Sequence, residues 1–148
     1  MIKMFKKVSL WFRPGFEYLE TTISGVELRA KCEDVFGKKS SIFIRGGIYK
    51  LITLETLAGF LNRDIIDKYH YDEDYFSCVD FSIVLWSRVI ENIKNIPFGM
   101  VWYETDKGIL HSRNCWLNPG LGRVQLIEPQ DDNIQDFPAG AKAIFVVM

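Results

Sequence analysis

The sequence predicts an α+β domain in which a long helix packs on an antiparallel sheet. Residues 54–62 and 78–94 carry apolar side chains three and four positions apart, as amphipathic helices do. Beyond Pro97 the pattern changes to short apolar and β-branched runs between turns, which favours strands. The 148 residues are 48% hydrophobic and 25% charged, so we expect one globular domain over residues 1–148.

Residues 1–52 are rich in β-branched and aromatic residues and are broken by turn residues at 13–15, 24–25, 37–38 and 46–47. This pattern predicts short strands or irregular structure, with residues 1–45 forming strands or an N-terminal extension. Next, Thr53 can cap a first helix over 54–62, because Leu54, Leu57 and Leu61 share one face.

Residues 64–69 could add a short helical turn, and the acidic, aromatic stretch 71–75 is predicted to be a loop. The second helix follows at 78–94, with Ser77 as its cap and Pro97 preventing its continuation. The residues expected on its buried stripe are Phe81, Val84 or Leu85, Val89 and Ile93.

Three runs after Pro97 predict an antiparallel meander: 100–103, 109–117 and 123–128. A polar loop over 129–142 leads to a last strand at 143–148. The expected order is therefore helices first and an antiparallel sheet afterwards.

Charge and composition exclude several classes of function. Lys and Arg number 18 against 19 Asp and Glu, which leaves no basic field to hold nucleic acid. No stretch reaches the roughly 20 apolar residues of a membrane-spanning helix, and the apolar run at 8–12 is too short for a signal peptide. We therefore expect a cytoplasmic protein that binds neither nucleic acid nor membrane. Its three cysteines cannot all pair within the chain, which argues against a disulfide scaffold.

One cysteine, one histidine and one glutamate could form a reactive site. Cys78 lies at the predicted N-terminus of the long helix, where free N–H groups and the helix dipole stabilise a thiolate. His111 lies on the second strand of the meander, and Glu128 ends the third. If these strands pair, imidazole and carboxylate become neighbours, and the order is that of a thiol nucleophile, a base and an orienting acid.

Four segments around these residues resemble a known family: Ser-Cys-Val-Asp-Phe-Ser at 77–82, Phe-Gly-Met-Val-Trp at 98–102, His-Ser-Arg-Asn at 111–114 and Ile-Glu-Pro-Gln at 127–130. They are similar to the papain-like cysteine peptidase domain at the C-terminus of a fungal agglutinin of the Marasmius type, and to related short bacterial and phage proteins. The resemblance covers about residues 45–135.

This resemblance implies a papain-like fold and a thiol hydrolase that cleaves peptide or isopeptide bonds through a Cys78 thioester. It implies His111 as general base and Glu128 as its orienting partner, with a peptide or protein as substrate. The residues expected to support the site are Gln130, Asn114 and Asp80. Ser77 and Val79 stand where the family usually has carboxylates, and the family's lectin domain has no counterpart in this sequence.

Other interpretations remain open. The chain could be a non-catalytic binding module or a phage accessory protein with the same fold. Glu128 could also be a strand end that pairs with Arg113 or Arg123, and His70 is expected to be a surface or packing residue.

No cofactor is expected, although two metal sites are conceivable. Cys115 shares a strand face with His111, so the two could bind zinc together with Cys78. The acidic loop residues that could bind calcium are Asp131, Asp132 and Asp136. The sequence leaves the oligomeric state open.

Overall fold

The computed structural model describes residues 16–148, so the part of the N-terminal prediction that falls on residues 1–15 lies outside the described residues. The larger sheet has, from edge to edge, β2 (Ser41–Phe43), β8 (Lys142–Val147), β4 (Phe98–Glu104), β5 (Leu110–Asn118), β6 (Arg123–Glu128) and β7 (Asn133–Gln135). A second sheet pairs β1 (Tyr18–Ser24) with β3 (Ile48–Ile52). The helices are α1 (Gly25–Phe36), α2 (Leu54–Arg63), the short 3-10 helix η1 (Ile66–Lys68) and α3 (Cys78–Asn92).

The predicted α+β class is confirmed, and the meander of β4, β5 and β6 is antiparallel as expected. The observed sheet has more strands than the predicted one, and it contains a parallel pair of strands as well as antiparallel pairs. Strand β2, from the N-terminal part of the chain, pairs in parallel with β8 at the sheet edge. Strand β7 forms inside the stretch that was predicted to be a polar loop. Three-residue edge strands carry too little apolar pattern to be recognised in a sequence.

Helix α1 was missed by the sequence analysis. Ser24 and Gly25 were interpreted as a turn, whereas Ser24 caps the helix and forms a capping box with Glu27. The Ser-x-x-Glu spacing is itself a helix-start signal. Behind it, Leu28, Cys32 and Phe36 recur every four residues and are all buried.

Helix α3 begins at Cys78, as predicted. The backbone N–H and the hydroxyl of Ser77 both donate to the Asp80 carboxylate, at 2.8 and 2.9 Å, which holds the first turn. Phe81, Leu85 and Val89 are buried along one stripe, so the predicted buried face is confirmed. The helix ends at Asn92, two residues before the expected end.

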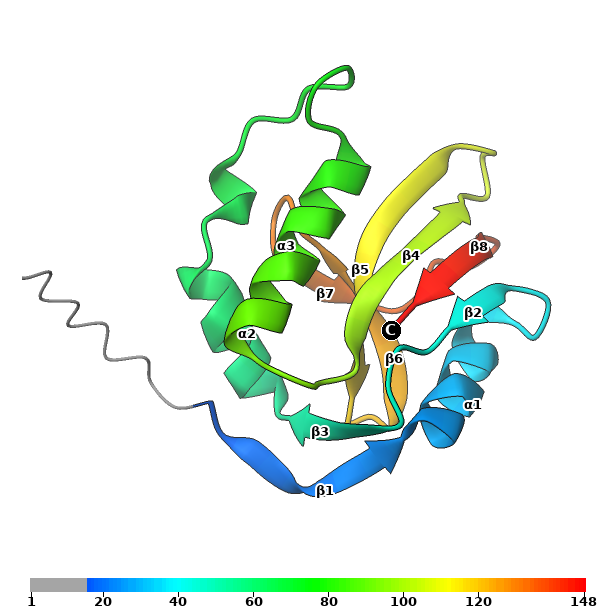
Figure 1. Ribbon diagram of the computed structural model, residues 1–148. Helices are drawn as coiled ribbons and strands as arrows, with labels where there is room; N and C mark the ends of the chain where they lie inside the picture. The colour runs from blue at the N-terminus through cyan, green and yellow to red at the C-terminus, as the bar shows by residue number, and fades with distance from the viewer. Residues whose placement is uncertain (1–15) are drawn as a thin grey trace, which may run out of the picture.

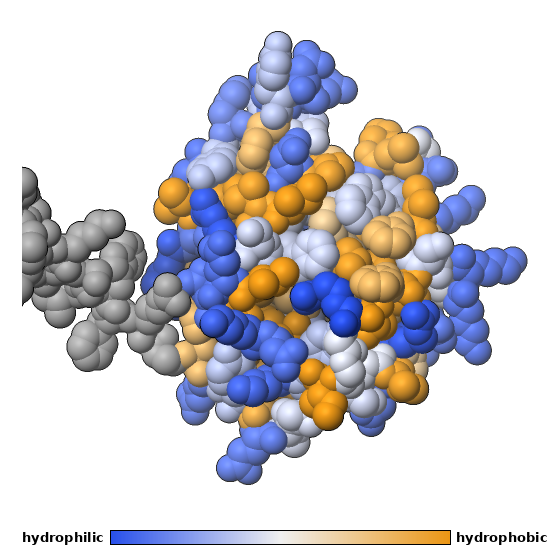
Figure 2. Space-filling view, viewed as in Figure 1, coloured by the Kyte–Doolittle hydropathy of each residue, from blue (hydrophilic) through white to orange (hydrophobic). Residues whose placement is uncertain are grey.

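Two apolar layers enclose the larger sheet. Helix α1 packs with β1 and with one face of the sheet, while α2 and α3 contribute to the layer on the other face (Figure 1). Apolar side chains also reach the surface over α3 and the neighbouring strands (Figure 2). Within residues 16–148, no helix is long and apolar enough to span a membrane.

Candidate functional site

Strands β5 and β6 bring His111 and Glu128 together at one end of their ladder. The Nε2 atom of His111 lies 3.1 Å from Oε2 of Glu128. Arg113, two residues along the same strand face, donates from Nε to the same oxygen at 2.7 Å. His111 and Arg113, which the sequence suggested as partners of Glu128, therefore both contact its carboxylate. Arg123, the other suggested partner, pairs with Asp136 instead, at 2.7 Å.

Cys78 reaches this pair from α3. Its thiol is hydrogen-bonded to His111 and to the backbone N–H of Ser112. The β5–β6 ladder ends at Asn114 and Ile127, shortly before Pro129, which has no N–H to continue it. The edge of β5 is therefore open at Ser112, and the first turn of α3 can approach it. The thiol is half-buried there.

The contacts among Cys78, His111 and Glu128 shift the pKa of each group towards its charged form. The hydrogen bond from His111 lowers the pKa of the Cys78 thiol, although burial opposes the shift. Hydrogen bonds to Cys78 and Glu128 raise the pKa of His111 to about 9. Burial alone would raise the pKa of Glu128, but the His111 hydrogen bond and the Arg113 charge outweigh it, so that pKa is lowered. The arrangement therefore favours a thiolate, an imidazolium and a carboxylate in contact.

The three residues expected to support the site have three different roles in the structure. Gln130 donates to Oε1 of Glu128 from its backbone N–H and its side chain, at 3.4 and 3.3 Å, so it holds the carboxylate. Asp80 caps α3 beside Cys78. Asn114 is fully buried and bonds to backbone carbonyls of α3 and β4 rather than to His111.

The conceivable metal sites do not assemble. Cys115 is fully buried, with its sulfur 3.3 Å from that of Met148. Asp136 is engaged by Arg123, and His70 is exposed. Among residues 16–148, no group of three or more His, Cys, Asp or Glu side chains is placed to hold a metal ion.

Two neighbours of the thiol were not predicted from the sequence. Ser112 supplies a backbone N–H, which no side-chain pattern reveals. Tyr71, from the predicted loop, stacks on Phe81 with ring centroids 6.4 Å apart. Burial and then the nearby Cys78 raise the pKa of its hydroxyl. The only available signal for Tyr71 was that an aromatic, acidic loop precedes the cysteine helix.

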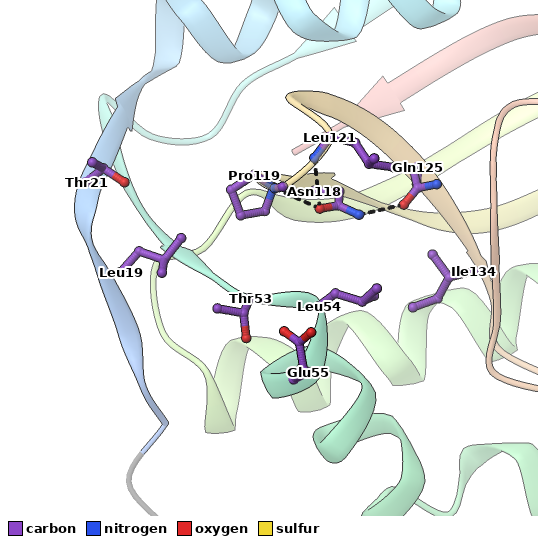
Figure 3. A pocket seen from close by; sticks show the side chains of 11 residues that line it. Leu19, Thr21, Thr53, Leu54, Glu55, Asn118, Pro119, Leu121, Gln125 and Ile134 are labelled. Carbon is purple, nitrogen blue, oxygen red and sulfur yellow. Dashed lines mark hydrogen bonds between the residues drawn. The ribbon is translucent and has the colours of Figure 1, made fainter.

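A cavity of about 690 Å³ lies at the opposite end of the β5–β6 hairpin, between β1, the start of α2 and the β5–β6 turn (Figure 3). Its apolar lining includes Leu19, Leu54, Leu121 and Ile134. Its polar lining is Thr21, Thr53, Glu55, Asn118 and Gln125. Asn118 donates to Gln125 and accepts from the turn backbone, so these two amides are already positioned.

Comparison with known proteins gives structural neighbours only. Neither a protein-family model nor a curated protein sequence matches the chain. Among solved structures, it is similar to one described as a PSL1a–E64 complex, with a TM-score of 0.72, 17% identity and 86% of this chain covered. It is also similar to Polyporus squamosus lectin bound to the human-type influenza-binding epitope Neu5Acα2-6Galβ1-4GlcNAc, with a TM-score of 0.68 and 17% identity over 86% of this chain. The chain spans about half the length of these proteins, 50% and 49%.

These neighbours correct the identification made from sequence. The proteins that share the fold are described as a lectin and as PSL1a, not as papain-like peptidases. The predicted family, the cleavage of peptide or isopeptide bonds, the cysteine-protease class and the peptide substrate are therefore wrong. Four short segments around Cys78, His111 and Glu128 describe a local site, whereas family and substrate depend on the whole chain. At 17% identity the similarity shows the fold alone.

Proposed function

We propose that this chain is a binding module that captures an electrophilic ligand at Cys78, with His111 and Glu128 as its partners. The observation that carries the proposal is the position of His111 between the Cys78 thiol and the Glu128 carboxylate. The capped helix that carries the cysteine, set against strands that carry the histidine and the glutamate, is part of the same proposal.

The chemistry is an addition. The thiolate of Cys78 forms a sulfur–carbon bond to an electrophilic carbonyl carbon, and the π electron pair of the carbonyl moves to its oxygen. The imidazolium of His111 gives its proton to that oxygen, and Glu128 orients the ring through Nε2. No group leaves, so each molecule of protein holds one ligand.

Alkylation of Cys78 tests the activated thiol that this function requires. The protein is treated with iodoacetamide and, separately, with E64, the compound named in the description of one neighbour. Intact mass is followed from pH 5 to 10, with Cys78→Ala as the control. We expect one adduct per chain in the wild type, at a rate that reaches half its maximum well below the ordinary thiol pKa of 9.0, and no adduct at this position in the variant.

An ordinary thiol profile in the wild type would contradict the reactive site. Release of more than one equivalent of product from a peptide would contradict the binding module and restore an enzymatic function.

A second candidate is glycan binding in the cavity beside β1 and α2. Apolar surface combined with amide, hydroxyl and carboxylate groups is the lining that a sugar ring needs, and the lectin neighbour is described with a bound glycan. Glu55 brings a negative charge to this cavity, which favours a neutral sugar over an acidic one.

Calorimetric titration decides between the sugars. We expect Galβ1-4GlcNAc to bind more tightly than Neu5Acα2-6Galβ1-4GlcNAc, and Glu55→Gln to reduce that preference. Glu91→Gln, on the exposed side of α3, is the control. An absence of heat with both glycans would end this candidate and leave the thiol site untouched.

A further inference from the structure

Three polar side chains are buried where α3 packs on β5. Ser82, Ser112 and Asn114 each have 0% exposure, next to a layer that is otherwise apolar. Burying a polar group costs free energy unless it is hydrogen-bonded, so a polar patch in this place requires a physical reason.

These side chains form one hydrogen-bonded network. Ser82 donates to the carbonyl of Cys78 at 3.0 Å, and Ser112 donates to the hydroxyl of Ser82 at 3.2 Å. Asn114 donates to the carbonyl of Ser82 at 2.9 Å and to that of Gly99 at 3.1 Å. Ser82 of α3 is thereby bonded to β5, and Asn114 links this contact to β4.

The network lies directly beside the reactive pair. Ser82 stands one helical turn after Cys78, and Ser112 follows His111 on β5. Ser112 also donates its backbone N–H to the Cys78 thiol. Apolar contacts would allow the helix to slide along the strand, whereas hydrogen bonds have a preferred length and direction. Since the distance between thiol and imidazole depends on where this turn sits, the network can set it.

We infer that Ser82, Ser112 and Asn114 are positioning residues that hold the first turn of α3 against β5 and so maintain the hydrogen bond between Cys78 and His111. This inference rests on the proposed thiol site and adds the residues that keep it assembled. The three residues act through Cys78 and touch no ligand.

The test compares Ser82→Ala, Ser112→Ala and the double variant with Leu85→Ala. Leu85 lies in the next turn of α3 and is fully buried, so its truncation weakens packing without removing a hydrogen bond. Iodoacetamide labelling of Cys78 is measured against pH, and urea unfolding is measured for each protein. The double variant removes both hydroxyls of the Ser112–Ser82 hydrogen bond, so neither is left buried without its partner, and the loss of stability is limited.

We expect the serine variants to label about three- to tenfold more slowly at pH 7, because the thiol pKa moves back towards its ordinary value. Leu85→Ala should be less stable but keep the wild-type pH midpoint. If the wild-type thiol is activated and the serine variants keep its midpoint, this inference is overturned while the proposed function stands. If the wild-type thiol itself titrates ordinarily, the site is absent and both fall.

Discussion

Glu128 is the residue on which the charges of the site converge. Its Oε2 accepts from both His111 and Arg113, and its Oε1 accepts from Gln130. Only about a tenth of its side chain is exposed, at 11%. A carboxylate in this position both orients the imidazole and stabilises its charged form.

Replacing Glu128 by glutamine should weaken the activation of Cys78. The amide can occupy the same space, but without the negative charge the pKa of His111 falls from about 9 towards 6.5. The thiol then loses the imidazolium that lowers its pKa most, and this outweighs the loss of the weaker direct repulsion from Glu128, so the thiol pKa rises. We expect labelling at pH 7 to slow by about tenfold. Iodoacetamide labelling against pH measures the change. Glu91→Gln serves as the control, and identical profiles for Glu128→Gln and wild type would remove Glu128 from the site.

Asp132, outside this site, lowers the stability of the protein when its carboxyl group is charged. Its φ is 60°, in the left-handed region that asparagine tolerates well. Burial, followed by the charges of Asp67 and Asp64, raises its pKa to about 6. Because the folded value lies above the unfolded value of 3.8, its contribution to stability is complete below pH 3.8 and is lost as pH rises through about 6.

Asp132→Asn should therefore stabilise the protein at pH 7 and have little effect at pH 4. Allowing for solvent screening of this partly exposed group, the gain should be about 0.5 to 1 kcal/mol. Urea unfolding at the two pH values measures it, with the exposed Asp106→Asn as a control. An equal change at both pH values would show that titration of Asp132 is not the cause.

At the scale of elements, helix α3 combines two faces with different tasks. Phe81, Leu85 and Val89 fill the apolar layer against the sheet, while Ile83 and Ile90 remain exposed at 47% and 42%. Ser82 stands on the inward side as well, among the residues that bond the helix to β5.

Leu85→Ala should cost about 2 to 5 kcal/mol of unfolding free energy, the range for truncating a fully buried leucine. Ile83→Ala, on the exposed side of the same helix, should cost less than about 1 kcal/mol. Urea unfolding of the two variants gives the comparison. Similar losses for both would mean that the two faces of α3 are wrongly assigned.

The elements differ in how far sequence could predict them. The periodicity of α2 and α3 was sufficient to place both helices, because each buries a stripe three and four residues apart, although Leu54, expected on the face of Leu57 and Leu61, is 41% exposed. Helix α1 has the same kind of stripe. It was not predicted because Ser24 and Gly25 were interpreted as a turn, although Ser24 and Glu27 have the spacing of a capping box. Strands β2 and β7 have three residues each and exist through their pairing, which a local pattern does not contain.

At the scale of the whole molecule, the centre of the sheet depends on a close approach of β4 to the end of the chain. A Cβ built at Gly99 would lie 1.7 Å from the carbonyl oxygen of Val147, which is backbone and cannot rotate away. Met100 and Val101 on the same strand pair with Val147 and Val146 of β8. Gly99 therefore permits the contact between strands that are distant in sequence.

Gly99→Ala should lower stability by more than about 3 kcal/mol or prevent folding, because the two strands would have to move apart. Gly47→Ala is the matched control, since a Cβ there would meet no described atom within 4 Å. Thermal unfolding followed by circular dichroism compares the two. A Gly99 variant with the wild-type midpoint would show that β4 and β8 can separate without loss.

The sequence by itself determined the α+β class, the two amphipathic helices, the start of α3 at Cys78 and the antiparallel order of β4, β5 and β6, because each follows from local periodicity, capping or turn chemistry. It also pointed to Cys78, His111 and Glu128, whose chemical types limit what they can do together. Only the tertiary structure decided that Glu128 is shared with Arg113, that Asn114 holds a helix rather than a ligand and that Cys115 is buried away from the thiol. These outcomes depend on strand register and on the packing of α3 over β5, which join residues about 15 to 35 positions apart and leave no local pattern in the chain.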